Sequence, residues 1–161
     1  MTRKRKPKRP TTVAGWREWV SLPDLSIPHL KAKLDTGARS SALHAFSLER
    51  FSEGDRDMVR FKVHPIQRDT SITIESVAEL VDERDVRDSG GRVERRPVIR
   101  TTLELGGNRW PIEVTLSRRD EMGFRMLLGR QALKRRHVVD PGASFTLGQG
   151  PGRDPSADEE E

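Results

Sequence analysis

Asp35 is the residue whose type and setting point most directly to chemistry. It opens the run Asp35-Thr36-Gly37-Ala38, directly after residues 30–34, in which apolar and basic side chains alternate as in a half-buried strand. A carboxylate on a tight turn at the end of a strand can remove a proton from a bound water molecule. Hydrolysis by this route needs a second carboxylate, which gives up a proton as the first one takes a proton. The tripeptide occurs once, so we expect the second carboxylate to come from another copy of the chain.

The bare tripeptide is also an ordinary turn in many proteins, so its surroundings decide its meaning. Alternation and turn signals predict a chain made mostly of strands, with residues 129–136 as the best helical candidate. The predicted strands are 13–22, 30–34, 42–46, 59–63, 72–75, 77–81, 102–105, 110–116, 124–128, 138–139 and 144–147. Many short strands separated by turns are typical of an all-β barrel or sandwich.

Glycine pairs mark two predicted hairpins. Gly106-Gly107 joins strands whose apolar residues recur at every second position and therefore face one core. Ser89-Gly90-Gly91 joins two arms within residues 82–96 that are too highly charged to lie in a core, so this hairpin should project into solvent. A further turn is predicted at residues 140–142, which read Asp-Pro-Gly.

Two segments together resemble the signatures of retropepsins, the single-domain aspartic peptidases of retroviruses. The segment 34–38, LDTGA, looks like their catalytic strand and turn, and the segment 126–133, MLLGRQAL, looks like their second signature of apolar residues, glycine and a short helix. Order and rough spacing agree over residues 30–134, apart from an insertion at roughly 49–69. The resemblance implies an all-β, single-domain closed barrel with one short C-terminal helix.

The same resemblance implies a role for each residue of the turn. Asp35 would supply one catalytic carboxylate from each subunit of a homodimer. Thr36 would lock the two turns together across the two-fold axis, and Gly37 would let the backbone approach the pair of acids. Ala38 would line the substrate channel.

The resemblance also implies parts that cover and support the turn. A flap that closes over a peptide or protein substrate would be formed by Ser89, Gly90 and Gly91. A ψ-shaped loop beside the turn would be formed by Leu127, Leu128, Gly129 and Arg130.

Longer stretches resemble a bacterial family of retropepsin-like aspartic peptidases, over nearly the whole chain apart from its ends. They are residues 15–20 (GWREWV), 31–45 (KAKLDTGARSSALHA) and 96–99 (RPVI). The family commonly carries the label ATP-dependent zinc protease. The sequence has no His-Glu-x-x-His, no cysteine and no helical pairing of its four histidines, so we predict no metal site. It also lacks a Gly-x-x-x-x-Gly-Lys-Ser/Thr loop, so we predict no cofactor.

One position departs from the viral pattern. Viral retropepsins usually have an acid after Asp-Thr-Gly-Ala, and that acid pairs with the arginine after the apolar-apolar-glycine motif, whereas this chain has Arg39. Arg130 therefore needs another partner, for which Glu18, Asp24 and Asp120 are candidates. A cation at position 39 would also favour the ionised form of the acid pair.

Composition separates a folded domain from two charged ends. Residues 1–12 hold six Lys or Arg, and residues 149–161 hold Gly, Pro and an acidic end. Neither buries enough apolar area to offset the entropy of ordering, so we expect both to be disordered, with one retropepsin-like domain at 13–148. No apolar run reaches the length of a membrane span and no secretory signal is visible. We therefore expect a cytoplasmic protein without a membrane partner.

Two functions from different classes stay open at this point. The first is a dimeric aspartic endopeptidase. The second is a catalytically inactive binding module of the same fold, associated with ribosomes or RNA through basic residues 3–9, which can contact phosphates without sequence preference. Trp16, Trp19 and Trp110 lie in apolar surroundings that indicate a core rather than a stacking platform for bases.

Overall fold

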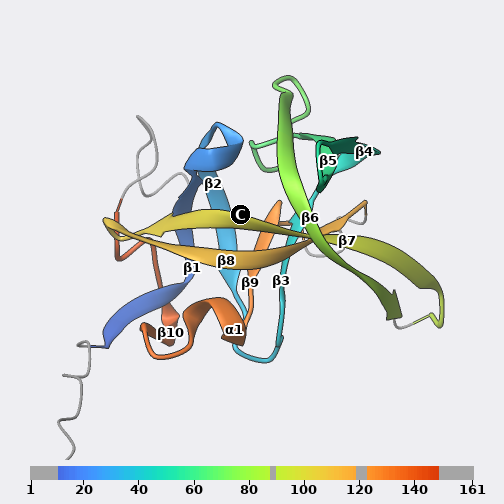
Figure 1. The fold of residues 1–161 in the computed structure, drawn as a ribbon. Coiled ribbons are helices and arrows are strands. Elements are labelled where there is room, and N and C mark those ends of the chain that lie inside the picture. Colours follow the sequence, from blue (N-terminus) through green and yellow to red (C-terminus); the bar gives the residue numbers. More distant parts are fainter. Residues whose placement is uncertain (1–10, 88–89, 119–122, 149–161) are drawn as a thin grey trace, which may run out of the picture.

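The computed structural model describes residues 11–87, 90–118 and 123–148. Within these residues the regular structure is mostly strand, with one 3-10 helix and one short α-helix (Figure 1). The elements are β1 (Thr12–Leu22), η1 (Pro23–Leu25), β2 (Ile27–Leu34), β3 (Ser41–His44), β4 (Phe46–Glu53), β5 (Arg56–Val63), β6 (Ile74–Arg87), β7 (Val93–Leu105), β8 (Asn108–Ser117), β9 (Met126–Leu128), α1 (Arg130–Leu133) and β10 (His137–Ser144).

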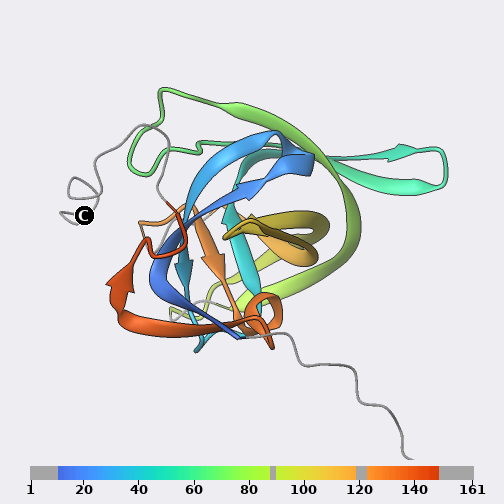
Figure 2. The ribbon, with the colours of Figure 1, turned by 90° about the vertical axis from the view of Figure 1, so that its left-hand side faces the viewer.

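Ten strands of the described residues pair into one sheet, in the order β10-β1-β2-β9-β3-β8-β7-β6-β5-β4. β1 also pairs with β7, through Ser21 opposite Glu104, so the strands from β1 to β7 in that order form a ring (Figure 2). The mostly β fold with one short helix is therefore confirmed. The closed barrel stays a prediction, because a single residue pair joins β1 to β7 among the described residues.

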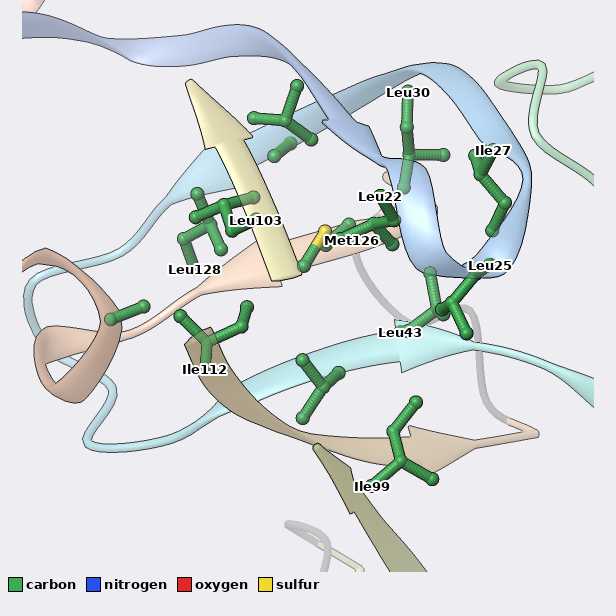
Figure 3. Packing of buried hydrophobic residues seen from close by; sticks show 14 of the residues in the cluster. Leu22, Leu25, Ile27, Leu30, Leu43, Ile99, Leu103, Ile112, Met126 and Leu128 are labelled. Atoms are coloured by element: carbon green, nitrogen blue, oxygen red, sulfur yellow. The ribbon is translucent and has the colours of Figure 1, made fainter. Parts of the chain in front are cut away.

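The core lies between these strands and is built from aliphatic side chains that are far apart in the sequence (Figure 3). The residues spaced by two that predict the hairpin of β7 and β8 are all buried, namely Leu103, Leu105, Ile112, Val114 and Leu116. Each such side chain contributes about 1.5–3 kcal/mol when it is fully buried. The ring of strands is therefore held together mainly by apolar packing.

The three tryptophans differ from one another in burial. Trp110 is buried, as predicted, and its indole N–H donates a hydrogen bond of 3.0 Å to the carbonyl of Ala132, which ties α1 to β8. Trp16 and Trp19 are only half-buried, so a core position is wrong for them. The guanidinium of Arg17 lies 4.9 Å from the ring centre of Trp16, and the ammonium of Lys31 lies 5.5 Å from that of Trp19.

Three predicted boundaries are wrong for local reasons. The strand predicted at 42–46 is broken at Ala45, whose N–H turns to the carbonyl of Ser117 (2.9 Å), and β4 then begins. The helix predicted at 129–136 contains only the four residues of α1, and Arg135 has a φ of 65° that no helix continues through. The strand predicted at 124–128 is reduced to β9.

The turn predicted at residues 140–142 lies inside β10 instead. β1 pairs with β10 in parallel, with Gly15 opposite Asp140 and Arg17 opposite Ser144, so β10 has two extra residues at this point. The extra length forms a bulge, in which the N–H of Gly142 donates to the Asp140 carboxylate (2.9 Å). The Asp-Pro-Gly signal therefore marks an irregularity in a strand and not its end.

The predicted hairpins are present in the described residues. Gly106 and Gly107 both have positive φ, 60° and 82°, as a two-residue turn between β7 and β8 requires. β6 and β7 pair up to Arg87 opposite Val93, and Gly91 in their turn has a φ of 85°. β4 and β5 form a hairpin within the predicted insertion, and it projects from the body (Figure 2).

Several predictions fall outside the described residues. These are the disorder of the two ends at 1–10 and 149–161, and the placement of Ser89 and Asp120. Where the chain is described, no helix is long and apolar enough to cross a membrane.

Candidate active site

Asp35 lies on the turn that leaves β2 and returns as β3, beside α1 (Figure 1). The backbone N–H of Gly37 donates a hydrogen bond of 2.9 Å to Oδ1 of Asp35 and so orients the carboxylate. A Cβ at position 37 would lie 3.1 Å from that oxygen, so glycine leaves room for the acid. Asp35 is half-buried and Thr36 is exposed. The carboxylate is thus held by the backbone while it still reaches solvent.

β9 passes between the two strands that flank this turn. Leu127 is opposite Lys33 in a parallel pairing with β2 and opposite Ala42 in an antiparallel pairing with β3. The N–H of Asp35 donates to the carbonyl of Leu128 (2.8 Å). The predicted second signature therefore lies directly against the predicted catalytic turn.

Gly129 follows β9 at a very close approach to the turn. A Cβ at this position would lie 2.4 Å from the carbonyl oxygen of Ser40 and 2.8 Å from that of Ala38. The N–H of Gly129 donates to Oγ of Ser41 (3.1 Å). Since real Cβ atoms do not approach backbone so closely, only glycine fits here.

Arg130 binds the turn itself. Its Nη1 donates to the carbonyls of Thr36 and Gly37, both at 3.1 Å. Its backbone N–H donates to the carbonyl of Ala38 (2.7 Å). One residue therefore holds three consecutive carbonyls of the turn.

The carboxylate partners predicted for Arg130 are wrong where the structure describes them. Glu18 is buried and accepts hydrogen bonds from the N–H groups of Gly15 (2.6 Å), Thr146 (3.1 Å) and Leu147 (3.1 Å). Asp24 accepts from the hydroxyl of Thr102 (2.6 Å). A partner that is a backbone carbonyl cannot be predicted from residue types, because every residue carries one.

A hollow of about 550 Å³ opens beside the turn and α1. Its lining comes from Thr36, Arg39, Arg130, Gln131, Leu133, Lys134 and His137. Burial, and then the neighbouring Arg136, lower the pKa of His137, so its imidazole adds no positive charge at neutral pH. The charge of the hollow therefore comes from two arginines and a lysine.

The hairpin of β6 and β7 has a different electrostatic character. Glu83 accepts hydrogen bonds from Arg50 of β4 and from Arg95 (2.7 Å), and these, in that order, hold the pKa of Glu83 below its ordinary value. Arg95 also pairs with Asp85 (3.2 Å), and Arg84 pairs with Asp82 (3.3 Å). The arms of the predicted flap are thus bound by ion pairs.

Glu94 ties β7 to the end of β8. Its carboxylate accepts hydrogen bonds from Arg96 (2.5 Å), from the hydroxyl of Ser117 (3.0 Å) and from the N–H of Arg118 (3.1 Å). Burial raises the pKa of Glu94, but these hydrogen bonds lower it by more, so the net pKa lies below the ordinary value. The hairpin is therefore tied to the end of β8 at a point next to its own turn, since Glu94 is the second residue of β7.

Three polar contacts near the turn were missed from the sequence. Ser41 accepts from Gly129 through its hydroxyl, and its carbonyl accepts from the hydroxyl of Thr115 (3.1 Å). Nη1 of Arg84 lies 3.5 Å from Oγ of Ser40, so the hairpin contacts the loop between β2 and β3. The only signal for these contacts is the pair of serines at the start of a predicted strand, where small hydroxyl groups are free to bond to backbone.

Within the residues that the structure describes, no group of three His, Asp or Glu side chains could hold a metal ion. His44 lies with Nε2 3.2 Å from the carbonyl of Arg118, and His64 with Nδ1 3.2 Å from that of Ile72.

The sequence model of the RimB-like family, described as the retropepsin-like aspartic endopeptidase RimB, matches residues 13–149. The chain belongs to this family. The match covers every described element except the first residue of β1, and includes the turn at Asp35 and the β9–α1 segment.

Curated relatives of this RimB-like chain carry another name. A "Probable alpha-L-glutamate ligase" of Shewanella halifaxensis is 42% identical over 137 residues, which are 85% of this chain and 30% of that protein. One of the same name from Parasynechococcus marenigrum is 46% identical over 136 residues, 84% of this chain and 29% of that protein. The chain thus spans about 30% of the length of these relatives.

A solved structure has the same fold. Protein Lpg0085 of Legionella pneumophila, described as having unknown function, is 29% identical, with a TM-score of 0.71 over 84% of this chain and 98% of its own. The RimB-like fold seen here is therefore shared by a protein of nearly the same extent.

Proposed function

We propose that this chain is an aspartic endopeptidase that acts as a homodimer, with one Asp35 from each subunit. The observation that carries the proposal is the geometry of the Asp35 carboxylate. Its Oδ1 accepts the N–H of Gly37 at 2.9 Å, on a turn braced from behind by β9 and Arg130. Membership of the retropepsin-like family supports the same reading.

The mechanism follows from two such carboxylates at close range. They share one proton, because both cannot carry a negative charge so near to each other. The ionised Asp35 takes a proton from a water molecule, whose oxygen attacks the carbonyl carbon of the scissile peptide bond. The protonated Asp35 of the other subunit donates its proton to the carbonyl oxygen as charge develops there.

Breakdown of the tetrahedral intermediate completes the cycle. The carbon–nitrogen bond breaks and the leaving amine takes a proton from one Asp35, while a hydroxyl of the intermediate returns its proton to the other Asp35. The products are a carboxylic acid and an amine, and the acid pair again holds one proton. The backbone bonds to the turn hold Asp35 still during these steps, so little reorganisation is needed.

The dimer is part of the proposal because one carboxylate cannot play both roles. Thr36 is exposed next to Asp35, where its hydroxyl would meet the partner's turn. The hairpin of β6 and β7 would act as the flap, with Gly90 and Gly91 at its described tip. A flap that closes over the substrate would exclude bulk water from the acid pair.

Acidic peptides, and glutamyl chains in particular, are the proposed substrates. Arg39, Arg130 and Lys134 border the turn without a described carboxylate partner and would attract negatively charged side chains. The curated relatives are named as glutamate ligases, and a peptidase region in such proteins would act on the product of that ligation.

Asp35→Asn tests the proposal. The substitution keeps the size of the side chain and should lower cleavage of a glutamate-rich peptide by at least about 1,000-fold. Asp57→Asn, at an exposed site on β5, is the matched control and should leave the rate unchanged. Mass photometry should give the same dimer for all three proteins with substrate present. Undiminished cleavage by Asp35→Asn would refute the proposal.

A further inference from the structure

The hollow beside Thr36 carries a positive charge that the fold leaves unbalanced. Among the described residues, no carboxylate lies within ion-pair distance of Arg39, Arg130 or Lys134. Arg130 uses its Nη1 on two backbone carbonyls, which do not neutralise it. By contrast, Arg84, Arg95 and Arg96 of the hairpin are each paired with a carboxylate. Cations gathered in one concave place without counter-charges form a site for an anionic partner.

The chain contains an anionic segment that matches this site. Residues 157–161 read Ala-Asp-Glu-Glu-Glu, and four of these five side chains are carboxylates. This acidic segment, defined here as residues 158–161, is separated from the last described residue, Gly148, by Gly- and Pro-containing sequence. Such a linker carries little apolar surface that would hold the segment elsewhere.

The starting point of this linker is fixed by the fold. Glu18 binds the backbone of Thr146 and Leu147. The side chain of Leu147 also lies 3.4 Å from the Cβ position of Gly106, in the turn between β7 and β8. The linker therefore begins near the start of β8.

The distance from this point to the hollow follows from the length of β8 between them. Lys134 and Gln131, which line the hollow, also lie against residues 111–113 of β8. These are five to seven residues from Gly106, which corresponds to roughly 17–23 Å of strand. Nine residues lie between Gly148 and Asp158, so ten Cα–Cα steps join the two, which span up to about 33 Å when extended. The linker is therefore long enough for the acidic segment to reach the hollow of its own chain.

We propose that the acidic segment 158–161 binds the cationic hollow lined by Arg39, Arg130 and Lys134 and competes there with acidic peptides. The tethered segment has an effective concentration of about 1 mM. If its intrinsic Kd for the hollow is about 0.1 mM, the segment is bound most of the time and lowers the apparent affinity of a competing peptide by roughly tenfold. The consequence for turnover rests on the proposed peptidase activity, whereas the binding itself does not.

The test measures binding of a fluorescein-labelled peptide with the sequence of residues 154–161, by fluorescence anisotropy at low salt. The full chain is compared with a full-length variant in which Asp158→Asn, Glu159→Gln, Glu160→Gln and Glu161→Gln remove the charge of the segment. We expect the neutral variant to bind the probe about tenfold more tightly. Equal affinities of the two proteins would overturn the proposal.

A second pair of variants locates the site. Arg39→Gln with Lys134→Gln, added to the neutral variant, should weaken the affinity for the probe by about tenfold or more. Arg130 is left unchanged because it stabilises the turn. Arg56→Gln with Lys62→Gln on β5 removes the same charge elsewhere and should leave the affinity within twofold. Equal losses from both pairs would mean that net charge alone attracts the probe, which also overturns the proposal.

Cleavage of a glutamate-rich peptide separates this inference from the proposed function. If both hold, the neutral variant lowers the KM by about tenfold and leaves kcat unchanged. A chain that cleaves nothing but shows the affinity difference refutes the peptidase and retains the inference. If the unmodified chain and the neutral variant cleave with the same KM and bind the probe equally, the peptidase activity is retained and the inference is refuted.

Discussion

The turn at Asp35 and the hairpin of β6 and β7 are in contact, but each is stabilised by a different kind of interaction. The turn is held by backbone hydrogen bonds and by Arg130, whose partners are carbonyls. The hairpin is held by cross-strand ion pairs, with Glu83 shared between Arg50 and Arg95. Neutral backbone bonds in a packed setting respond little to salt, whereas exposed ion pairs are screened by it.

This difference indicates that the turn and the hairpin have different roles. Arg39 in the turn and Lys134 at the end of α1 form no ion pair with a described carboxylate, so both can bind a ligand. In the hairpin, by contrast, Arg84, Arg95 and Arg96 are each paired with a carboxylate. A rigid acid beside a more weakly bound hairpin is the arrangement that a peptidase with a moving flap requires.

The largest expected effect is on the turn, from Gly129→Ala. The new Cβ would lie 2.4 Å from the carbonyl oxygen of Ser40, and backbone cannot move away without breaking the pairing of β9. We expect the free energy of unfolding to fall by about 3 kcal/mol. Urea denaturation measures it, with Gly142→Ala as the control, because a Cβ there would lie 3.4 Å from a side-chain oxygen of Asp140 and the backbone has no positive φ. A loss below about 1 kcal/mol would mean that the turn is not tightly packed.

Arg130→Met should have the next largest effect. It tests whether Arg130 positions the Asp35 turn. Removal of the donors to Thr36 and Gly37 should lower kcat by about tenfold or more, since a charge-assisted hydrogen bond contributes about 1.5–3 kcal/mol. KM should rise as well, because Arg130 is one of the cations proposed to attract acidic substrates, and Arg130→Lys, which keeps the charge, should restore KM more fully than kcat. An unchanged kcat with a raised KM would assign Arg130 to substrate binding instead.

Glu94→Gln tests the link between the hairpin, close to its turn, and the end of β8. Because the folded-state pKa of Glu94 is below its unfolded value, its contribution to stability is present above the unfolded pKa and is lost as pH falls through the folded pKa. We expect the substitution to cost about 1 kcal/mol at pH 7 and less below pH of about 4. Urea midpoints over this pH range measure the difference. A cost that is independent of pH would contradict an ionic role.

Glu83→Gln should have the smallest effect and the strongest salt dependence. It removes the carboxylate shared by Arg50 and Arg95, both partly exposed, and should cost under about 1 kcal/mol at low salt. The cost should shrink further at 1 M salt, whereas the cost of Gly129→Ala should not change. Equal salt dependence of the two variants would remove the distinction between the two regions.

Much of this architecture is predictable because it depends on local patterns. Alternation in residues 102–116 predicts the hairpin of β7 and β8, and Leu127-Leu128-Gly129 predicts the strand that packs against the turn. The positions of Asp35 and Arg130 also follow from their motifs. These are features that each sequence segment specifies by itself.

Contacts that depend on backbone or on distant segments are not predictable in the same way. The partners of Arg130 are carbonyls, Glu18 binds residues 146 and 147 from the far end of the domain, and Asp-Pro-Gly forms a bulge because β1 pairs beside it. The hollow is likewise assembled from the turn, α1 and β10. Only the folded chain brings these groups together.

The central claim is that each active site needs Asp35 from two chains. Its most direct test mixes equal amounts of the unmodified chain and the Asp35→Asn chain after subunit exchange, at constant total concentration. If mixed dimers are inactive, the cleavage rate falls to roughly a quarter of that of the unmodified chain, because only that fraction of dimers has two acids. A rate of about half would mean that each chain works alone, and would contradict the claim.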